Sequence, residues 1–208
     1  MNDKDIVLLL DYGGVLGYDH LMPQEEQLAH TLGLTQAELN NRISEKSEIG
    51  QSFRENKITE LDFWKTISGN NDIDTEFAHR LTCMWMDTYA LNETMMSYLQ
   101  QLRQKIKVGV LTNIDIARST LLKDILNADI NLDYYFPSYS LGYSKDTPQL
   151  WNLVDESLRQ YNDKMVIVIY VDDRAEHVLS AERIGWKGIR YYTLDQLIKQ
   201  IDLLIINS

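Results

Sequence analysis

Short, unbroken runs of apolar residues recur along the chain and predict strands that are buried on both faces. The clearest runs are 6–10, 106–111 and 166–171. Runs this short, without alternation of apolar and polar residues, are typical of inner strands in a parallel sheet. Two further candidates at 134–139 and 188–192 bring the number of predicted strands to five.

Helical patterns separate these strands. From residue 92 onward the order is helix, strand, helix, strand, and so on to the end of the chain. Helix starts are marked by Asn92 and by Thr147 followed by proline, and Gly185 marks a helix end. Strands that alternate with helices imply a parallel sheet with right-handed crossovers. We therefore expect an α/β fold with a Rossmann-like core.

The stretch between the first strand and residue 98 reads as one helix after another. Its helix start signals are Pro23, Thr35, Thr59 and Asp74, and Thr35 has a glutamate three residues later as in a capping box. This stretch is too long to be a single crossover. We expect a core formed by residues 1–16 and 99–208, with a small all-helical cap inserted at 17–98.

Composition and charge exclude several classes of protein. Among the 208 residues the formal net charge is −11, which disfavours nonspecific binding to nucleic acid or to anionic membranes. The apolar runs are too short to span a bilayer, and the N-terminus lacks the features of a signal peptide. The single cysteine, Cys83, allows no internal disulfide and favours a cytoplasmic location.

Polar side chains follow three of the predicted strands, and one lysine lies in a loop that leads into a helix. These residues are Asp11, Thr112, Asn113, Lys145, Asp172 and Asp173. Because the carboxyl ends of parallel strands meet at one edge of a sheet, we expect these side chains to share a crevice there. Clustered carboxylates repel one another, and an oxygen-bound Mg²⁺ ion would relieve this repulsion. With Lys145 and the backbone N–H groups of the Gly13-Gly14 turn, Mg²⁺ makes a phosphate site in which Asp11 can attack phosphorus.

The order of these segments resembles the four motifs of the haloacid-dehalogenase (HAD)-like hydrolases, specifically the subfamily I phosphatases with a helical cap. The resemblance covers nearly the whole chain. Its motifs are residues 11–16, Thr112-Asn113, Lys145 (with the usual adjoining proline displaced to position 148) and Asp172-Asp173.

The resemblance implies a Mg²⁺ site. Asp11 would be both the nucleophile and a metal ligand, and Gly13 would offer its backbone carbonyl. Asp173 would bind Mg²⁺ directly, and Asp172 would act through water or from the second coordination shell.

The resemblance also implies a site for a phosphorylated small molecule. Thr112 and Asn113 would hold the phosphoryl group. Lys145 would neutralise both Asp11 and the phosphoryl group during transfer.

Gly13 departs from the pattern of typical family phosphatases, which have an aspartate there as general acid and base. Losing such a group costs about two to four decades of rate. This departure predicts either slow turnover or a substrate with a good leaving group, such as a sugar-1-phosphate or an acyl phosphate. The family branch with glycine at this position includes sugar-1-phosphate phosphatases. Asp19 or His20 could supply the missing proton, although His20 is better explained as an ordinary cap residue.

We expect a Mg²⁺-dependent phosphatase, a phosphoric monoester hydrolase acting on a small metabolite such as a sugar phosphate through an aspartyl-phosphate. The alternative is an impaired relative that binds a phosphorylated ligand or protein. A phospho-acceptor receiver domain fits less well, because its paired acids follow the first strand. A dehalogenase also fits less well, because dehalogenases of this family lack the metal site that Asp173 implies. His177 is expected to be an exposed helix residue.

Overall fold

A five-stranded parallel sheet forms the centre of the protein. The computed structural model describes residues 4–17, 22–86, 91–129, 131–161 and 165–206. The strands, in the spatial order β3-β2-β1-β4-β5, are β1 (Lys4–Leu10), β2 (Lys107–Thr112), β3 (Tyr134–Pro137), β4 (Met165–Asp172) and β5 (Lys187–Arg190). The structure confirms the α/β, Rossmann-like fold and all five predicted strands, which differ from the predictions by a few residues at their ends.

The strand register aligns the carboxyl ends of β1, β2 and β4 at one edge of the sheet. Leu10, the last residue of β1, pairs with Val110 of β2 on one side and with Val171 of β4 on the other. The residues that follow these positions therefore emerge side by side at the carboxyl edge. This arrangement confirms the expectation that Asp11, Thr112 and Asp172 lie at a common edge.

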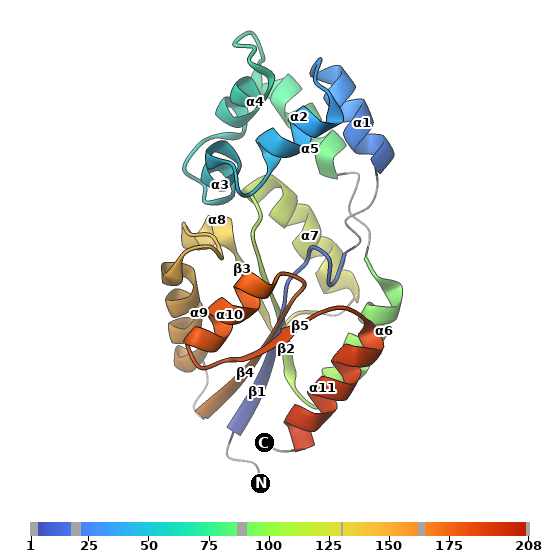
Figure 1. Cartoon of the computed structure of the whole chain (residues 1–208), viewed down its shortest axis with the longest axis vertical. Helices are drawn as coiled ribbons and strands as arrows, with labels where there is room; N and C mark the ends of the chain where they lie inside the picture. The colour runs from blue at the N-terminus through green and yellow to red at the C-terminus, as the bar shows by residue number, and fades with distance from the viewer. Residues whose placement is uncertain (1–3, 18–21, 87–90, 130, 162–164, 207–208) are drawn as a thin grey trace.

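Helices cover both faces of the sheet. One face packs against α6 (Glu93–Leu102), α7 (Ile116–Asp129) and α11 (Leu194–Ile206), and the other packs against α9 (Pro148–Gln160) and α10 (Ala175–Arg183). Side chains alternate along β1, so that Leu8 and Leu10 belong to the first apolar core and Val7 and Leu9 to the second. This two-sided burial explains why the strand sequences show no polar alternation. Figure 1 shows these layers below the remaining helices.

The remaining helices form a separate layer beyond the carboxyl ends of the strands (Figure 1). They are α1 (Met22–Thr31), α2 (Gln36–Ile43), α3 (Glu48–Arg54), α4 (Glu60–Ser68) and α5 (Thr75–Met86). They have their own apolar core, in which the Phe63 ring stacks on Phe53 with 4.2 Å between centroids and Trp64 is fully buried. The short helix α8 (Ser138–Leu141) follows β3 directly.

The structure suggests a shorter cap than the predicted 17–98. Met95, Met96 and Leu99 of α6 pack in the apolar core of the sheet, and none of them belongs to the core that α1–α5 share. We propose that the cap comprises α1–α5 and ends before α6. Within the described residues, no helix is both long and apolar enough to cross a membrane.

Several predicted helix starts are confirmed by their hydrogen bonds. Thr35 and Glu38 form the complete capping box, with the Glu38 N–H donating to Thr35 Oγ1 over 3.2 Å. Thr59 and Asn92 likewise accept from backbone N–H groups in the first turns of α4 and α6. Helix α3 was not predicted, because it is only seven residues long and its core-facing pattern is interrupted by glycine.

Candidate active site

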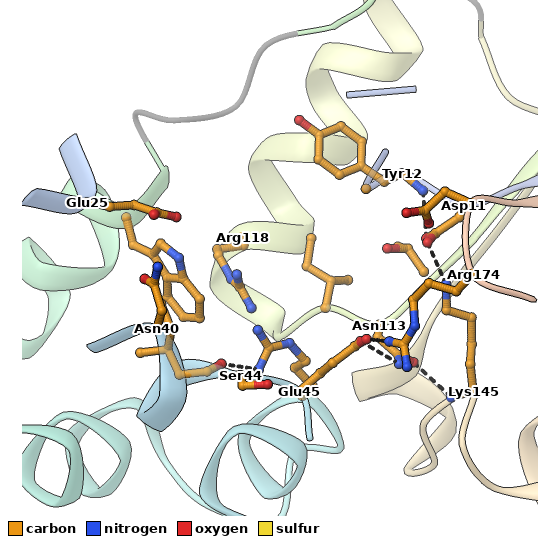
Figure 2. Close-up of a pocket in the computed structure, with 17 residues that line it drawn as sticks. Asp11, Tyr12, Glu25, Asn40, Ser44, Glu45, Asn113, Arg118, Lys145 and Arg174 are labelled. Atoms are coloured by element: carbon orange, nitrogen blue, oxygen red, sulfur yellow. Dashed lines mark hydrogen bonds and ion pairs between the residues drawn. The ribbon is translucent and has the colours of Figure 1, made fainter. Parts of the chain in front are cut away.

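The predicted site residues come together around one cavity. A cavity of about 360 Å³ lies where the carboxyl edge of the sheet faces the cap, and it is lined by Asp11, Thr112, Asn113, Lys145 and Asp173 (Figure 2). The backbone at Gly13 also lines it. Asp172 is fully buried and does not line this cavity.

Asp11 is a buried carboxylate at the end of β1. The chain turns sharply after it, because the Tyr12 carbonyl accepts backbone hydrogen bonds from Leu16 over 2.9 Å and from Gly17 over 2.8 Å. The Asp11 Oδ1 atom accepts from the N–H of Tyr12 at 2.7 Å, and Oδ2 lies 2.7 Å from Nζ of Lys145. Burial raises the pKa of Asp11 to about 6, although the nearby Lys145 ammonium opposes this shift. The site therefore still favours an additional positive charge beside Asp11.

Lys145 is a fully buried ammonium that joins two carboxylates. Its Nζ atom lies 2.7 Å from Asp11 Oδ2 and 2.9 Å from Asp172 Oδ2. Burial alone would lower the pKa of Lys145, but these two carboxylates raise it above its usual value. Its backbone is fixed as well, because its N–H donates to Asn113 Oδ1 at 2.9 Å and its carbonyl accepts from Trp151 Nε1 at 2.8 Å. The ammonium is thus charged and held in one place.

Asp172 holds Lys145 and has little capacity for further ligands. Its Oδ2 atom accepts from Lys145 and from the Tyr170 hydroxyl at 2.5 Å and lies 3.1 Å from His177 Nδ1, while Oδ1 accepts from the Arg174 N–H at 2.9 Å. Burial alone would raise the pKa of Asp172, but Lys145 and His177 hold it below its ordinary range. These contacts favour the second-shell role expected for Asp172.

His177 is buried, so the expectation of an exposed helix residue is wrong. Its side chain is only 1 % exposed. Helix α10 begins three residues after the end of β4, so its first turn lies against the end of that strand. The ring lies against Asp172 on one side, and Nε2 is 3.5 Å from Asp146 on the other. Burial alone would lower the pKa of His177, but the nearby carboxylates of Asp146 and Asp172 raise it.

Asp173 lies against the turn that follows Asp11 and lines the same cavity. Gly14 has a φ of +67°, and a Cβ atom added there would lie 2.8 Å from Cγ of Asp173. Glycine therefore lets the first turn approach this carboxylate closely. Asp11, Asp172 and His177 also place ligand atoms within 4.8 Å of one another. Lys145 already contacts two of those three residues, whereas Asp11 and Asp173 both line the cavity.

The cap reaches the site through the turn between α2 and α3. Glu45 in this turn accepts a hydrogen bond from Asn113 Nδ2 at 2.9 Å and forms an ion pair with Arg174, and all three residues line the cavity (Figure 2). The Asn113 Oδ1 atom accepts a hydrogen bond from the Lys145 N–H, which fixes the amide so that its NH₂ group points toward the cap. Glu45 and Arg174 were not predicted as site residues, since their contacts join segments far apart in sequence.

The far end of the cavity is polar. Arg54 and Arg118 lie on the Trp85 ring, with guanidinium carbons 5.5 Å and 3.5 Å from its centroid. Asn40 and Glu25 line the same end, away from Asp11 in Figure 2. These hydrogen-bonding groups suit a hydroxyl-bearing substrate better than a hydrocarbon one. Asp19 and His20, which were considered as proton donors, lie outside the described residues.

Comparison with known proteins was informative only at the level of structure. Neither a protein-family model nor a curated protein matches the sequence. The HAD family enzyme BT-2542 from Bacteroides thetaiotaomicron, in complex with magnesium and inorganic phosphate, superposes with a TM-score of 0.72 at 15% identity, covering 90% of this chain and 94% of that one. The chain has the fold of a HAD-like hydrolase.

Other HAD-like structures span the same architecture. A HAD-like family hydrolase from Porphyromonas gingivalis matches with a TM-score of 0.68 and 14% identity over 97% of both chains. The L-2-haloacid dehalogenase PA0810 matches with a TM-score of 0.61 and 18% identity, over 88% of this chain and 82% of that one. At these identities the likeness establishes the HAD-like fold, and the chemistry must be argued from the site itself.

Proposed function

We propose that this protein is a Mg²⁺-dependent phosphatase that acts on a small phosphorylated metabolite through an aspartyl-phosphate. The observation that carries this proposal is the buried Asp11–Lys145 pair, which opens onto a cavity shared with Thr112, Asn113 and Asp173. A carboxylate held in this way can act as a nucleophile toward phosphorus. The negative charge and single cysteine are consistent with a cytoplasmic enzyme whose partner is a small molecule and not nucleic acid.

Three groups would hold the metal: the carboxylates of Asp11 and Asp173 and the backbone carbonyl of Gly13. This set is all oxygen, as Mg²⁺ prefers, and both carboxylates line the same cavity. The magnesium and phosphate bound to BT-2542 support the same assignment. Bound Mg²⁺ would neutralise charge on the phosphoryl oxygens. Asp172 would act indirectly, by holding Lys145.

The chain's own residues account for the first chemical step. An Asp11 oxygen forms a bond to phosphorus while the bond from phosphorus to the leaving oxygen breaks, and the electron pair departs with that oxygen. Lys145 donates to the transferring group, and Thr112 and Asn113 hold its oxygens in line with the nucleophile. Because Lys145 is buried, the attraction of its ammonium to the phosphoryl oxygens is little screened by water.

Gly13 narrows the substrate class. Without an acid at this position, a leaving oxygen that needs little protonation is favoured, as in a sugar-1-phosphate or an acyl phosphate. The polar far end of the cavity, with Asn40, Arg54 and Arg118, supports a substrate that carries hydroxyl groups. A sugar-1-phosphate satisfies both conditions.

The alternative is a protein that binds a phosphorylated ligand without turning it over. Gly13 is its main support. A binding module needs cations and hydrogen-bond donors, but it has no need for the buried nucleophile Asp11 in contact with Lys145. We therefore favour the enzyme.

The test is phosphate release across sugar-1-phosphates, sugar-6-phosphates, nucleotides, acetyl phosphate and an aryl phosphate, with halide release from a 2-haloacid measured in parallel. We expect release to be strongest on anomeric and acyl phosphates and to disappear with EDTA or with Asp11→Asn. Halide release without phosphate release would show that the protein is a dehalogenase and not a phosphatase. Tight substrate binding without any release would support the binding module.

A further inference from the structure

Hydrolysis of an aspartyl-phosphate requires a proton acceptor for the attacking water, and Gly13 has no side chain to provide it. Among the described residues that line the cavity, the carboxylates are Asp11, Glu25, Glu45 and Asp173. Asp11 would carry the phosphoryl group, and Asp173 is assigned to the metal. Among the residues that the structure describes, the remaining candidates for this acceptor are therefore the two cap residues, Glu25 and Glu45.

Glu45 is the one in contact with the phosphoryl-binding residues. Its Oε2 atom accepts from Asn113 Nδ2 at 2.9 Å, whereas Glu25 lies at the opposite end of the cavity, beside Asn40 (Figure 2). The NH₂ group of an asparagine has two N–H donors. Asn113 can therefore hold Glu45 with one and a phosphoryl oxygen with the other, which places the carboxylate next to the phosphoryl group.

Both carboxylate oxygens of Glu45 have a partner. Arg174 pairs with one carboxylate oxygen and Asn113 donates to the other. Arg174 is itself anchored, because its N–H donates to Asp172 Oδ1 at 2.9 Å and its side chain also pairs with Glu176. An ionised Glu45 is poorly suited to protonate a leaving group, in agreement with a substrate whose leaving group does not need a proton.

Hydrogen bonds of Ser47 close the turn that carries Glu45. The Ser47 hydroxyl donates to the carbonyls of Arg42 and Ser44 at 2.7 and 2.8 Å and accepts from the Gly50 N–H at 3.0 Å. These bonds close the turn between α2 and α3. Glu45 is thus presented to the site in a defined position.

Helix α3 is in turn fixed to the core. The Ser138 hydroxyl donates to the Arg54 carbonyl at 2.8 Å, and Glu55 accepts from the Ser144 N–H at 2.9 Å, next to Lys145 in the chain. The carboxylate of Glu45 is therefore held relative to the phosphoryl site by contacts on both sides of the cavity. Such positioning is what general-base catalysis requires.

We propose that Glu45 is the general base for hydrolysis of the Asp11 phosphoenzyme; this rests on the proposed phosphatase function. The water oxygen forms a bond to phosphorus as Glu45 takes one of its protons. The bond between phosphorus and the Asp11 oxygen breaks, and the electron pair returns to the Asp11 carboxylate. Inorganic phosphate leaves, and Glu45 releases its proton to solvent. Hydrolysis then depends on the cap residue being in place over the core.

The test compares wild type with Glu45→Gln, Glu45→Asp and the control Glu48→Gln, an exposed glutamate at the start of α3. Acetyl phosphate is the probe, and steady-state release and the fraction of phosphorylated protein in acid-quenched samples are measured. For Glu45→Gln we expect kcat to fall about 10²–10³-fold, as for loss of a general base. The phosphorylated fraction should rise, because formation of the phosphoenzyme is spared. Glu45→Asp should restore part of the rate, and Glu48→Gln should match wild type.

Three results would overturn the proposal. An unchanged kcat in Glu45→Gln, with or without a change in KM, would show that Glu45 only holds the cap against the core. A low kcat without accumulation of phosphoenzyme in either Glu45 variant, with thermal midpoints unchanged, would place its effect in the first step. If wild type releases no more phosphate than Asp11→Asn, the phosphatase function itself is refuted. This comparison is made first, before any Glu45 variant is measured.

Discussion

Replacing Lys145 by methionine removes the positive charge that joins two buried carboxylates. Nζ of Lys145 lies 2.7 Å from Asp11 and 2.9 Å from Asp172, and both carboxylates are less than a tenth exposed. Methionine is of similar length and fills the space, so the substitution tests charge more than packing. We expect the loss of stability to come from the carboxylates left without their counterion.

The size of the loss follows from the partners that remain. Removing one member of a buried ion pair costs about 3–5 kcal/mol. Asp172 keeps hydrogen bonds from Tyr170, His177 and the Arg174 N–H, so its share is reduced. We therefore expect the free energy of unfolding to fall by about 3 kcal/mol, the lower end of this range.

Urea denaturation of wild type and Lys145→Met at pH 7, without Mg²⁺, measures this loss. Lys199→Met is the control, because Lys199 is exposed on α11, and it should change stability by no more than about 0.5 kcal/mol. In Lys145→Met, the additional change Asp11→Asn should restore about 1 kcal/mol or more, since it removes one uncompensated charge. A loss as small as that of the control, or no recovery in the double variant, would refute this account of the ion pair.

Three further predictions concern the metal, the cap and pH. Gly14→Ala should abolish the thermal stabilisation of the protein by Mg²⁺, because its Cβ would displace Asp173, whereas Gly33→Ala, with the same φ of +67° and nothing within 4 Å, should keep it; equal Mg²⁺ responses would contradict this. Trp64→Ala should lower the free energy of unfolding in urea by about 3–5 kcal/mol, because the ring is fully buried in the cap core, and a loss near 1 kcal/mol would mean that the cap unfolds separately. Burial would raise the pKa of Glu55, but hydrogen bonds hold it below its ordinary value of 4.5, so its stabilising effect is present above that pH and is lost as pH falls. Wild type should therefore lose more stability than Glu55→Gln on acidification from about pH 5 to 3, and parallel curves would contradict this.

The sequence predicted the sheet and the gathering of polar residues because both depend on local signals. Apolar runs identify strands buried on two sides, and the parallel arrangement then brings Asp11, Thr112 and Asp172 to one edge. Lys145 could be added because its loop enters a helix at the same edge. Thr147 shows the limit of such signals: it precedes α9 as predicted, yet its hydroxyl donates to the Ser144 carbonyl instead of capping the helix.

Residues whose roles depend on tertiary contacts could not be predicted. Glu45 meets Asn113 across 68 residues of chain, so no local pattern marks it. His177 was expected to be an exposed helix residue, but the short connection between β4 and α10 places it in the core. Whether a polar side chain is buried depends on which face of its helix packs against the core. For α10, the short connection to the end of β4 sets that face.

The central claim is that Asp11 forms a covalent phosphoenzyme, and its most direct test is acid quenching of wild type during turnover of acetyl phosphate with Mg²⁺, followed by peptide mass analysis. The account predicts one added phosphoryl group on the peptide that contains Asp11, absent with EDTA and absent in Asp11→Asn. Phosphate release that proceeds without this adduct and persists in Asp11→Asn would contradict the account.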